Sequence, residues 1–240
     1  MDNVSRSQAA KVDSLSALSG AQLLDRLFES LLLKPLIPVT HPPAIFSSGE
    51  RPTNTVPDPS GDHVLNPDFS GRLVQQPLKP AAVLIAINRN AAEPEVVMTV
   101  RTANLSSHAG QIAFPGGRID PGEAPEEAAV REAFEEVGLD QDAGSLKGFL
   151  PSYASRTGYR VYPVVSLVDG WPPLVANPAE VADIFFVPLR FLLDPRNVSK
   201  TSRFFEGAER FFYTYQYGDR RIWGLTAGII HHMSSRVLTN

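Results

Sequence analysis

The chain contains no cysteine, which excludes disulfides, thiolate nucleophiles and cysteine-based zinc sites. It also lacks an excess of positive charge, because 22 Lys and Arg face 26 Asp and Glu. Broad binding to nucleic acid or to an anionic membrane requires a basic surface, so we expect neither partner. No apolar run approaches the roughly 20 residues that span a bilayer. No secretory signal or C-terminal address is recognisable, and we therefore expect a cytoplasmic protein that acts on a small molecule.

Prolines are spread unevenly and suggest a division of the chain. We predict an N-terminal extension over residues 1–77 and a compact domain over residues 78–238. Ser19 and Gln22 form a capping box that opens a short helix over about 20–33. Prolines then recur over about 35–67, too often for a helix or a central strand, which predicts an extended linker. The short helix could cap the domain or pair with a second copy of the chain in a homodimer.

The compact part combines short apolar runs with two substantial helical patterns. We predict a β-hairpin that joins 203–205 to 211–217 across 206–209, and a closing helix over 223–237. Further strands are expected at 81–87, 96–101, 111–114, 146–150, 160–168 and 183–187. Strands interrupted by helices without regular alternation predict an α/β fold, with a mixed sheet covered on both faces.

A helix is predicted from Pro125 to Val137, because proline suits a first helical turn and Gly138 suits the position just past a helix end. Three carboxylates, of Glu132, Glu135 and Glu136, are spaced to share one face. Each like-charge pair costs roughly 0.2–0.5 kcal/mol in an isolated helix. The opposite face should dock on the core through Val130, Ala133, Phe134 and Val137.

The acidic face has two explanations that the residues alone leave open. It could be a solvated surface on which Arg131 relieves the charge by pairing with Glu127 and Glu135, each four residues away. Alternatively, a divalent cation could compensate the carboxylates. Oxygen ligands without Cys or His favour a hard ion such as Mg²⁺ or Mn²⁺ over Zn²⁺.

The whole segment from residue 117 to residue 139 resembles the signature box of the Nudix hydrolases. The fixed positions of that box are occupied by Gly117, Glu123, Arg131, Glu132, Glu135, Glu136, Gly138 and Leu139, while Ala133 is a small occupant of its apolar position. The resemblance implies the Nudix fold, an α/β/α sandwich with the box as a loop–helix–loop beside the sheet. It also implies metal-dependent hydrolysis of a phosphoanhydride in a nucleoside diphosphate joined to another moiety.

The same resemblance suggests roles for individual residues. It implies that Glu132 and Glu136 are metal ligands and that Glu135 is a third ligand or the catalytic base. Arg131 would orient the carboxylates through Glu123. A sharp turn at 115–117 would let the backbone N–H groups of Gly116 and Gly117 approach a phosphate of the substrate.

A second pattern, over 97–117, resembles the extra motif of the coenzyme A pyrophosphatase branch. Thr99, Arg101, Gly110, Phe114, Pro115, Gly116 and Gly117 match that motif, whereas Thr102 and Ser106 depart from it. The branch implies hydrolysis of coenzyme A or acyl-CoA to phosphopantetheine and adenosine bisphosphate. Ser106 stands in place of an arginine, which leaves open ADP-ribose, a dinucleotide or a nucleoside triphosphate as the substrate. A non-hydrolytic sensor of a nucleotide metabolite is the alternative of another class.

For several residues outside the box, a structural or solvated role must be compared with a functional one. Arg101 could contact a phosphate of the substrate or form an ion pair at the surface, and the sequence favours neither role. The loop residues Arg156 and Arg160 are predicted to be solvated rather than to contact a ligand. Glu180 is predicted to be a capping or solvated residue rather than a distal base or ligand. His108, His231 and His232 are given no catalytic role, the last two as surface residues.

Overall fold

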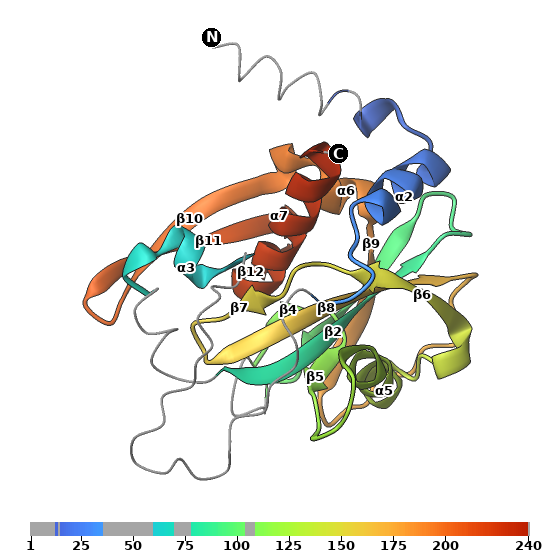
Figure 1. The fold of residues 1–240 in the computed structure, drawn as a ribbon, viewed down its shortest axis with the longest axis horizontal. Coiled ribbons are helices and arrows are strands. Elements are labelled where there is room, and N and C mark those ends of the chain that lie inside the picture. The colour runs from blue at the N-terminus through green and yellow to red at the C-terminus, as the bar shows by residue number, and fades with distance from the viewer. Residues whose placement is uncertain (1–12, 14, 36–59, 70–77, 104–108, 240) are drawn as a thin grey trace.

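The computed structural model describes residues 13, 15–35, 60–69, 78–103 and 109–239. A mixed sheet of nine strands runs through the molecule (Figure 1). Its strands are β1 (Ser60–Gly61), β2 (Lys79–Asn88), β3 (Glu95–Arg101), β4 (Ile112–Ala113), β5 (Gly116–Arg118), β6 (Gly144–Phe149), β7 (Tyr153–Ala154), β8 (Tyr159–Val168) and β9 (Val181–Pro188). The order is β1-β7-β8-β2-β3-β4, while β5 pairs with β2, β6 with β8 and β9 with β3. The central pair β2–β8 is parallel and β3 is antiparallel to β2, as predicted for a mixed sheet.

Helices cover both faces of this sheet (Figure 1). Alternate side chains of β2 enter two separate cores, because successive strand residues point to opposite faces. Ile85 and Ile87 join the core beneath α2 (Gly20–Glu29), α6 (Leu189–Leu193) and α7 (Gly224–Thr239). Leu84 and Ala86 join the core beneath α5 (Pro125–Val137). The predicted sandwich is therefore confirmed.

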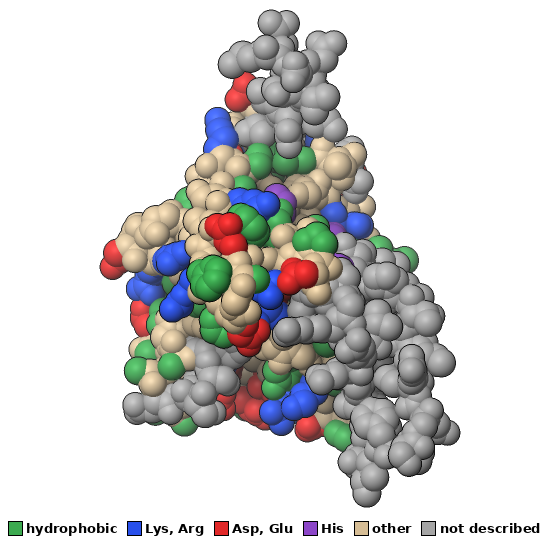
Figure 2. Space-filling model, turned by 90° about the vertical axis from the view of Figure 1, so that its left-hand side faces the viewer, with side chains coloured by type: hydrophobic (Ala, Val, Ile, Leu, Met, Phe, Trp, Pro, Cys, Tyr) green, Lys and Arg blue, Asp and Glu red, His purple; other side chains and the backbone are tan. Residues whose placement is uncertain are grey.

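A smaller antiparallel sheet extends from one side of the molecule. It consists of β10 (Val198–Phe205), β11 (Ala208–Tyr217) and β12 (Arg220–Trp223). The predicted hairpin is present, but its turn has two residues rather than four. Glu206 and Gly207 both have positive φ angles, 50° and 77°, which is the twist that a tight hairpin requires. Figure 2 views the molecule from the side of this hairpin, where Lys and Arg side chains lie among hydrophobic ones.

The N-terminal helix α2 is part of the folded body. The Ser19–Gln22 capping box is present, and the buried Leu23 and Leu27 enter the core shared with α7. The helix ends at Glu29, earlier than predicted, because the backbone of Leu32 pairs with that of Phe149 at the end of β6. Since the apolar face of α2 is buried within its own chain, a homodimer would have to use another surface.

The predicted extended linker is wrong at residues 62–65, which are helical, whereas residues 60–61 are extended. After β1, which pairs in parallel with β7, residues Asp62–Leu65 form the short helix α3. Tertiary hydrogen bonds hold this helix, because the Asp62 carboxylate accepts from the Tyr153 hydroxyl at 2.9 Å and from the Arg156 N–H at 2.7 Å. Residues 36–59 lie outside the described residues, and the boundary near residue 77 stays a prediction.

Among the described residues, 3₁₀ turns lie at Pro67–Phe69, Gln141–Ala143 and Pro195–Asn197. Among the residues that the structure describes, no helix is long and apolar enough to cross a membrane.

Candidate active site

The two glycines of the predicted turn belong to a strand. Gly116 and Gly117 lie in β5, opposite Val83 and Ala82 of β2, so the predicted turn is wrong at these positions. A side chain on either glycine would force a neighbouring group to move. A Cβ atom on Gly116 would lie 2.3 Å from the carbonyl oxygen of Ala82, and one on Gly117 would lie 2.4 Å from the carboxylate carbon of Glu132. The strand therefore brings bare backbone directly against the acidic helix.

Helix α5 has the bounds that its terminal residues predict. Gly138 ends it in the left-handed conformation, with φ of 70°, and its N–H donates to the carbonyl of Phe134. The prediction that Phe134 docks on the core is wrong, because its side chain is 53% exposed. Small residues face the sheet instead, which allows the helix to approach closely. They are Ala128, Ala129 and Ala133, and Val137 is buried beside them.

Glu136 is the most unusual residue of this helix, because a carboxylate in its last turn is only 3% exposed. Its Oε2 accepts a hydrogen bond from the Gly116 N–H at 3.2 Å, and its Oε1 lies 3.4 Å from Nη1 of Arg101. Burial raises the pKa of Glu136 to about 7, although the Gly116 N–H and Arg101 both favour the charged form. The structure thus joins Arg101 and Gly116, which come from the upstream motif, to the box helix.

Arg131 connects the remaining carboxylates of the box. Its Nε and Nη2 hold the two oxygens of Glu123 at 2.8 and 3.0 Å, and its Nη1 lies 3.1 Å from Oε1 of Glu132. The hydrogen bond from Arg131 lowers the pKa of Glu123, whereas burial raises that of Glu132. Glu127 takes another partner, the N–H of Ala124, instead of the expected pairing with Arg131.

Glu135 lies apart from the buried carboxylate of Glu136 and the half-buried carboxylate of Glu132. Its side chain is 52% exposed, and its Oε2 lies 3.4 Å from Nη1 of Arg131. Within the described part of the chain, no three acidic or histidine side chains are already gathered closely enough to hold an ion together. Glu132 and Glu136 are brought together on the side of β5, and Glu135 is directed toward solvent.

Glu180 is the residue whose importance the sequence understates. Its charge raises the pKa of both Glu132 and Glu136, so its carboxylate lies in their vicinity. The pairing of β9 with β3 brings it there, and its carbonyl accepts the Thr102 N–H at 2.9 Å. The only signal in the sequence is a glutamate just before a strand, which does not identify the neighbouring strand.

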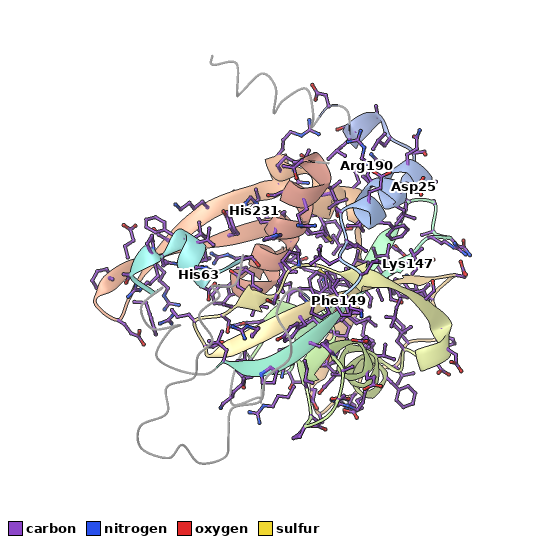
Figure 3. The ribbon with its side chains drawn as sticks, viewed as in Figure 1. Asp25, His63, Lys147, Phe149, Arg190 and His231 are labelled. Atoms are coloured by element: carbon purple, nitrogen blue, oxygen red, sulfur yellow. The ribbon has the colours of Figure 1, made fainter. Side chains whose placement is uncertain are left out.

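Other candidates lie away from the carboxylates. Arg156 pairs with Glu206 at 2.9 Å, and its guanidinium lies 4.6 Å from the ring centroid of Phe205. Arg160 is buried, contrary to its predicted solvation. His231 lies on α7 toward the small sheet (Figure 3), 3.9 Å from the ring of Tyr213. His231 and His232 are half-buried instead of exposed as predicted, and burial lowers the pKa of both. Ser106 and His108 lie outside the described residues.

Two carboxylates on a helix, set against glycine backbone and flanked by two arginines, define a site suited to phosphate chemistry. Comparisons with known proteins name the family. The NUDIX domain model matches residues 77–207, which is more than half of the chain. The chain therefore belongs to the Nudix family. It is a hydrolase that acts on pyrophosphate bonds, and enzymes of this family generally use a divalent cation.

Two relatives identified by sequence agree with this assignment. The chain is 39% identical over 180 residues to an uncharacterized Nudix hydrolase NudL from Photorhabdus laumondii, which covers 71% of this chain and 96% of the relative. It is also 39% identical over 158 residues to a NudL protein from Yersinia pestis, covering 65% and 79%. The crystal structure of the Nudix hydrolase RenU from M. smegmatis is 26% identical, with a TM-score of 0.41 over 48% of this chain and 73% of that one.

The residues present fit a divalent cation. The donors are oxygens only, which suits a hard ion. Beyond the effect of burial, the charge of Glu132 raises the pKa of Glu136 and the charge of Glu180 raises the pKa of both, a repulsion that a cation would relieve. Nε of Arg101 is buried without a hydrogen-bond partner, so the one guanidinium that compensates Glu136 is incompletely satisfied there.

The raised pKa of Glu136 predicts a pH dependence of stability in the metal-free protein. Folding favours the protonated carboxyl, so its stabilising effect is full below the usual value of 4.5 and is lost as the pH rises to about 7. We expect the free energy of unfolding to fall by on the order of 3 kcal/mol across this window. Denaturant unfolding in EDTA at several pH values measures it.

The matched control is Glu136→Gln, which cannot titrate. His231 and His232, whose pKa values are lowered, change stability in the opposite direction, so the informative quantity is the difference between wild type and variant. If that difference is independent of pH between 4.5 and 7, Glu136 does not titrate as inferred.

Proposed function

We propose that the chain hydrolyses the phosphoanhydride of coenzyme A or acyl-CoA, giving phosphopantetheine and adenosine bisphosphate. The observation that carries this proposal is the contact of Arg101 with Glu136, at 3.4 Å. Arg101 belongs to the pattern that resembles the coenzyme A pyrophosphatase branch, and Glu136 belongs to the box. The two patterns thus contribute to one site, as a substrate-specific motif beside the hydrolytic carboxylates would.

In this proposal Glu132 and Glu136 hold Mg²⁺ or Mn²⁺. When bound, such a cation neutralises pyrophosphate oxygens and lowers the pKa of water. Arg131 keeps Glu132 in place, because Glu123 and the carbonyl of Arg118 fix the guanidinium from the other side at 2.8–3.0 Å. The Gly116 N–H orients Glu136, and the absence of a side chain at Gly117 leaves room for the carboxylate of Glu132.

The proton of the attacking water requires a base. We propose Glu135, whose exposed carboxylate is tied to Arg131 at 3.4 Å and can reach a substrate on the solvent side of the helix. Glu180 is the second candidate for this role, or for that of a third ligand, because its charge acts on both Glu132 and Glu136.

A hydrolysis panel tests the substrate. Coenzyme A, acetyl-CoA, ADP-ribose, a dinucleotide and a nucleoside triphosphate would be compared at matched concentrations with Mg²⁺ and with Mn²⁺. We expect coenzyme A or its thioester to have a kcat/KM at least about tenfold above the others, about 1.4 kcal/mol of transition-state discrimination. EDTA should abolish turnover. A preference for ADP-ribose, a dinucleotide or a triphosphate would contradict the substrate proposal and retain the reaction class.

A further inference from the structure

The contact between Arg101 and Glu136 is a weak restraint on a strongly buried charge. One distance of 3.4 Å joins Nη1 to Oε1, and Nε of Arg101 is buried without a partner. The guanidinium sits where β3 changes register against β9, between Val100 and Arg101, and its side chain is 23% exposed. Arg101 is therefore placed between a buried carboxylate and solvent.

Arg131 provides the contrast within the same site. Four acceptors hold its guanidinium: both oxygens of Glu123, Oε1 of Glu132 and the carbonyl of Arg118 lie within 3.1 Å. A planar guanidinium held in this way loses several charge-assisted hydrogen bonds if it moves. Within the described part of the chain, Arg101 would lose one long contact, the 3.4 Å contact with Glu136. Of the two arginines beside the carboxylates, Arg101 is the one that can exchange partners.

We propose that Arg101 occupies Glu136 in place of the divalent cation and moves to the substrate when the cation binds. A cation on Glu136 would repel the guanidinium, because two positive groups would share one carboxylate in a site shielded from water. The displaced guanidinium then meets the pyrophosphate, whose oxygens match its fork of donors. Metal binding thus precedes and favours substrate binding. The inference rests on the proposed metal site, and it holds for any pyrophosphate substrate.

The test measures metal affinity without substrate. Wild type, Arg101→Met and Arg101→Lys would be stripped with EDTA and titrated with Mn²⁺ by calorimetry and by electron paramagnetic resonance of free Mn²⁺. We expect Arg101→Met to bind Mn²⁺ about tenfold more tightly, because a competitor for Glu136 is gone. Its KM for the substrate should rise at least about tenfold. The Mn²⁺ affinity and the KM of Arg101→Lys should lie between those of wild type and Arg101→Met. Lysine keeps the positive charge but lacks the forked donors of the guanidinium.

The matched control is Arg220→Met, which removes an arginine that pairs with Asp183 on β9. Its Mn²⁺ affinity should stay within about twofold of wild type. Thermal unfolding adds a second readout that does not depend on activity. Arg101→Met should melt below wild type in EDTA, because Glu136 loses its counter-charge, and saturating Mn²⁺ should close the gap.

Two outcomes overturn the proposal. Arg101→Met could bind Mn²⁺ as weakly as wild type or more weakly, which would show that the guanidinium does not compete with the cation. Wild type could fail to bind Mn²⁺ at all, which would also remove the proposed metal site. Failure of coenzyme A in the hydrolysis panel would refute the proposed substrate alone, since the Mn²⁺ titration contains no substrate.

Discussion

Replacing Glu136 with glutamine is expected to abolish measurable turnover while the protein stays folded. Glu136 is the most buried carboxylate of α5, and in the proposed site it is a direct ligand of the cation. Loss of an outer-shell partner of a metal ligand typically costs 10–100-fold, so loss of the ligand's charge should exceed about 100-fold. The amide is nearly the same size and can still accept from the Gly116 N–H. Steady-state hydrolysis at saturating Mn²⁺ measures the loss, and circular dichroism checks the fold.

Glu126→Gln is the matched control for this change. Glu126 lies in the first turn of the same helix, apart from Glu132 and Glu136, and its substitution removes the same charge. We expect its turnover to remain within about threefold of wild type, since only a first-turn charge interaction with the helix dipole is lost. Retained activity in purified, metal-loaded Glu136→Gln would contradict the role of Glu136 as a ligand.

The box helix could be predicted closely because its determinants are local. Pro125 fixes the first turn and Gly138 adopts the left-handed conformation that ends a helix, so both bounds follow from neighbouring residues. The exposure of Phe134 was missed because apolar character alone does not define the buried stripe. Small alanines determine which side of α5 can approach the sheet. The burial of Glu136, which the charge pattern did not reveal, follows from the same orientation.

Contacts between distant segments could not be predicted from local patterns. Glu180 reaches the carboxylates because β9 pairs with β3, and Gly116 meets Glu136 because β5 pairs with β2. A glycine pair after a proline indicates a turn as readily as a strand without side chains. In the same way, the helix α3 depends on the contacts of Asp62 with Tyr153 and Arg156, about ninety positions away in the sequence.

Gly117→Ala should reduce activity strongly with little effect on stability. The new Cβ would lie 2.4–2.5 Å from the carboxylate atoms of Glu132, well inside an ordinary contact distance. Because the far end of a flexible side chain is involved, Glu132 can yield by about 1 Å without disturbing the backbone. A displacement of about 1 Å in a catalytic group can cost 100-fold in rate, and we expect a loss of this order in kcat. The free energy of unfolding should fall by less than about 1 kcal/mol.

Gly122→Ala is the matched control, because it should lower stability more than activity. Gly122 lies in the same box with φ of 88°, and nothing lies within 4 Å of the added Cβ. An alanine there meets backbone strain of about 1–2 kcal/mol but does not touch a carboxylate. Its unfolding free energy should therefore fall more than that of Gly117→Ala, while its kcat stays within a few-fold of wild type. If Gly117→Ala retains full activity, Glu132 is not held at the position on which the proposed metal site depends.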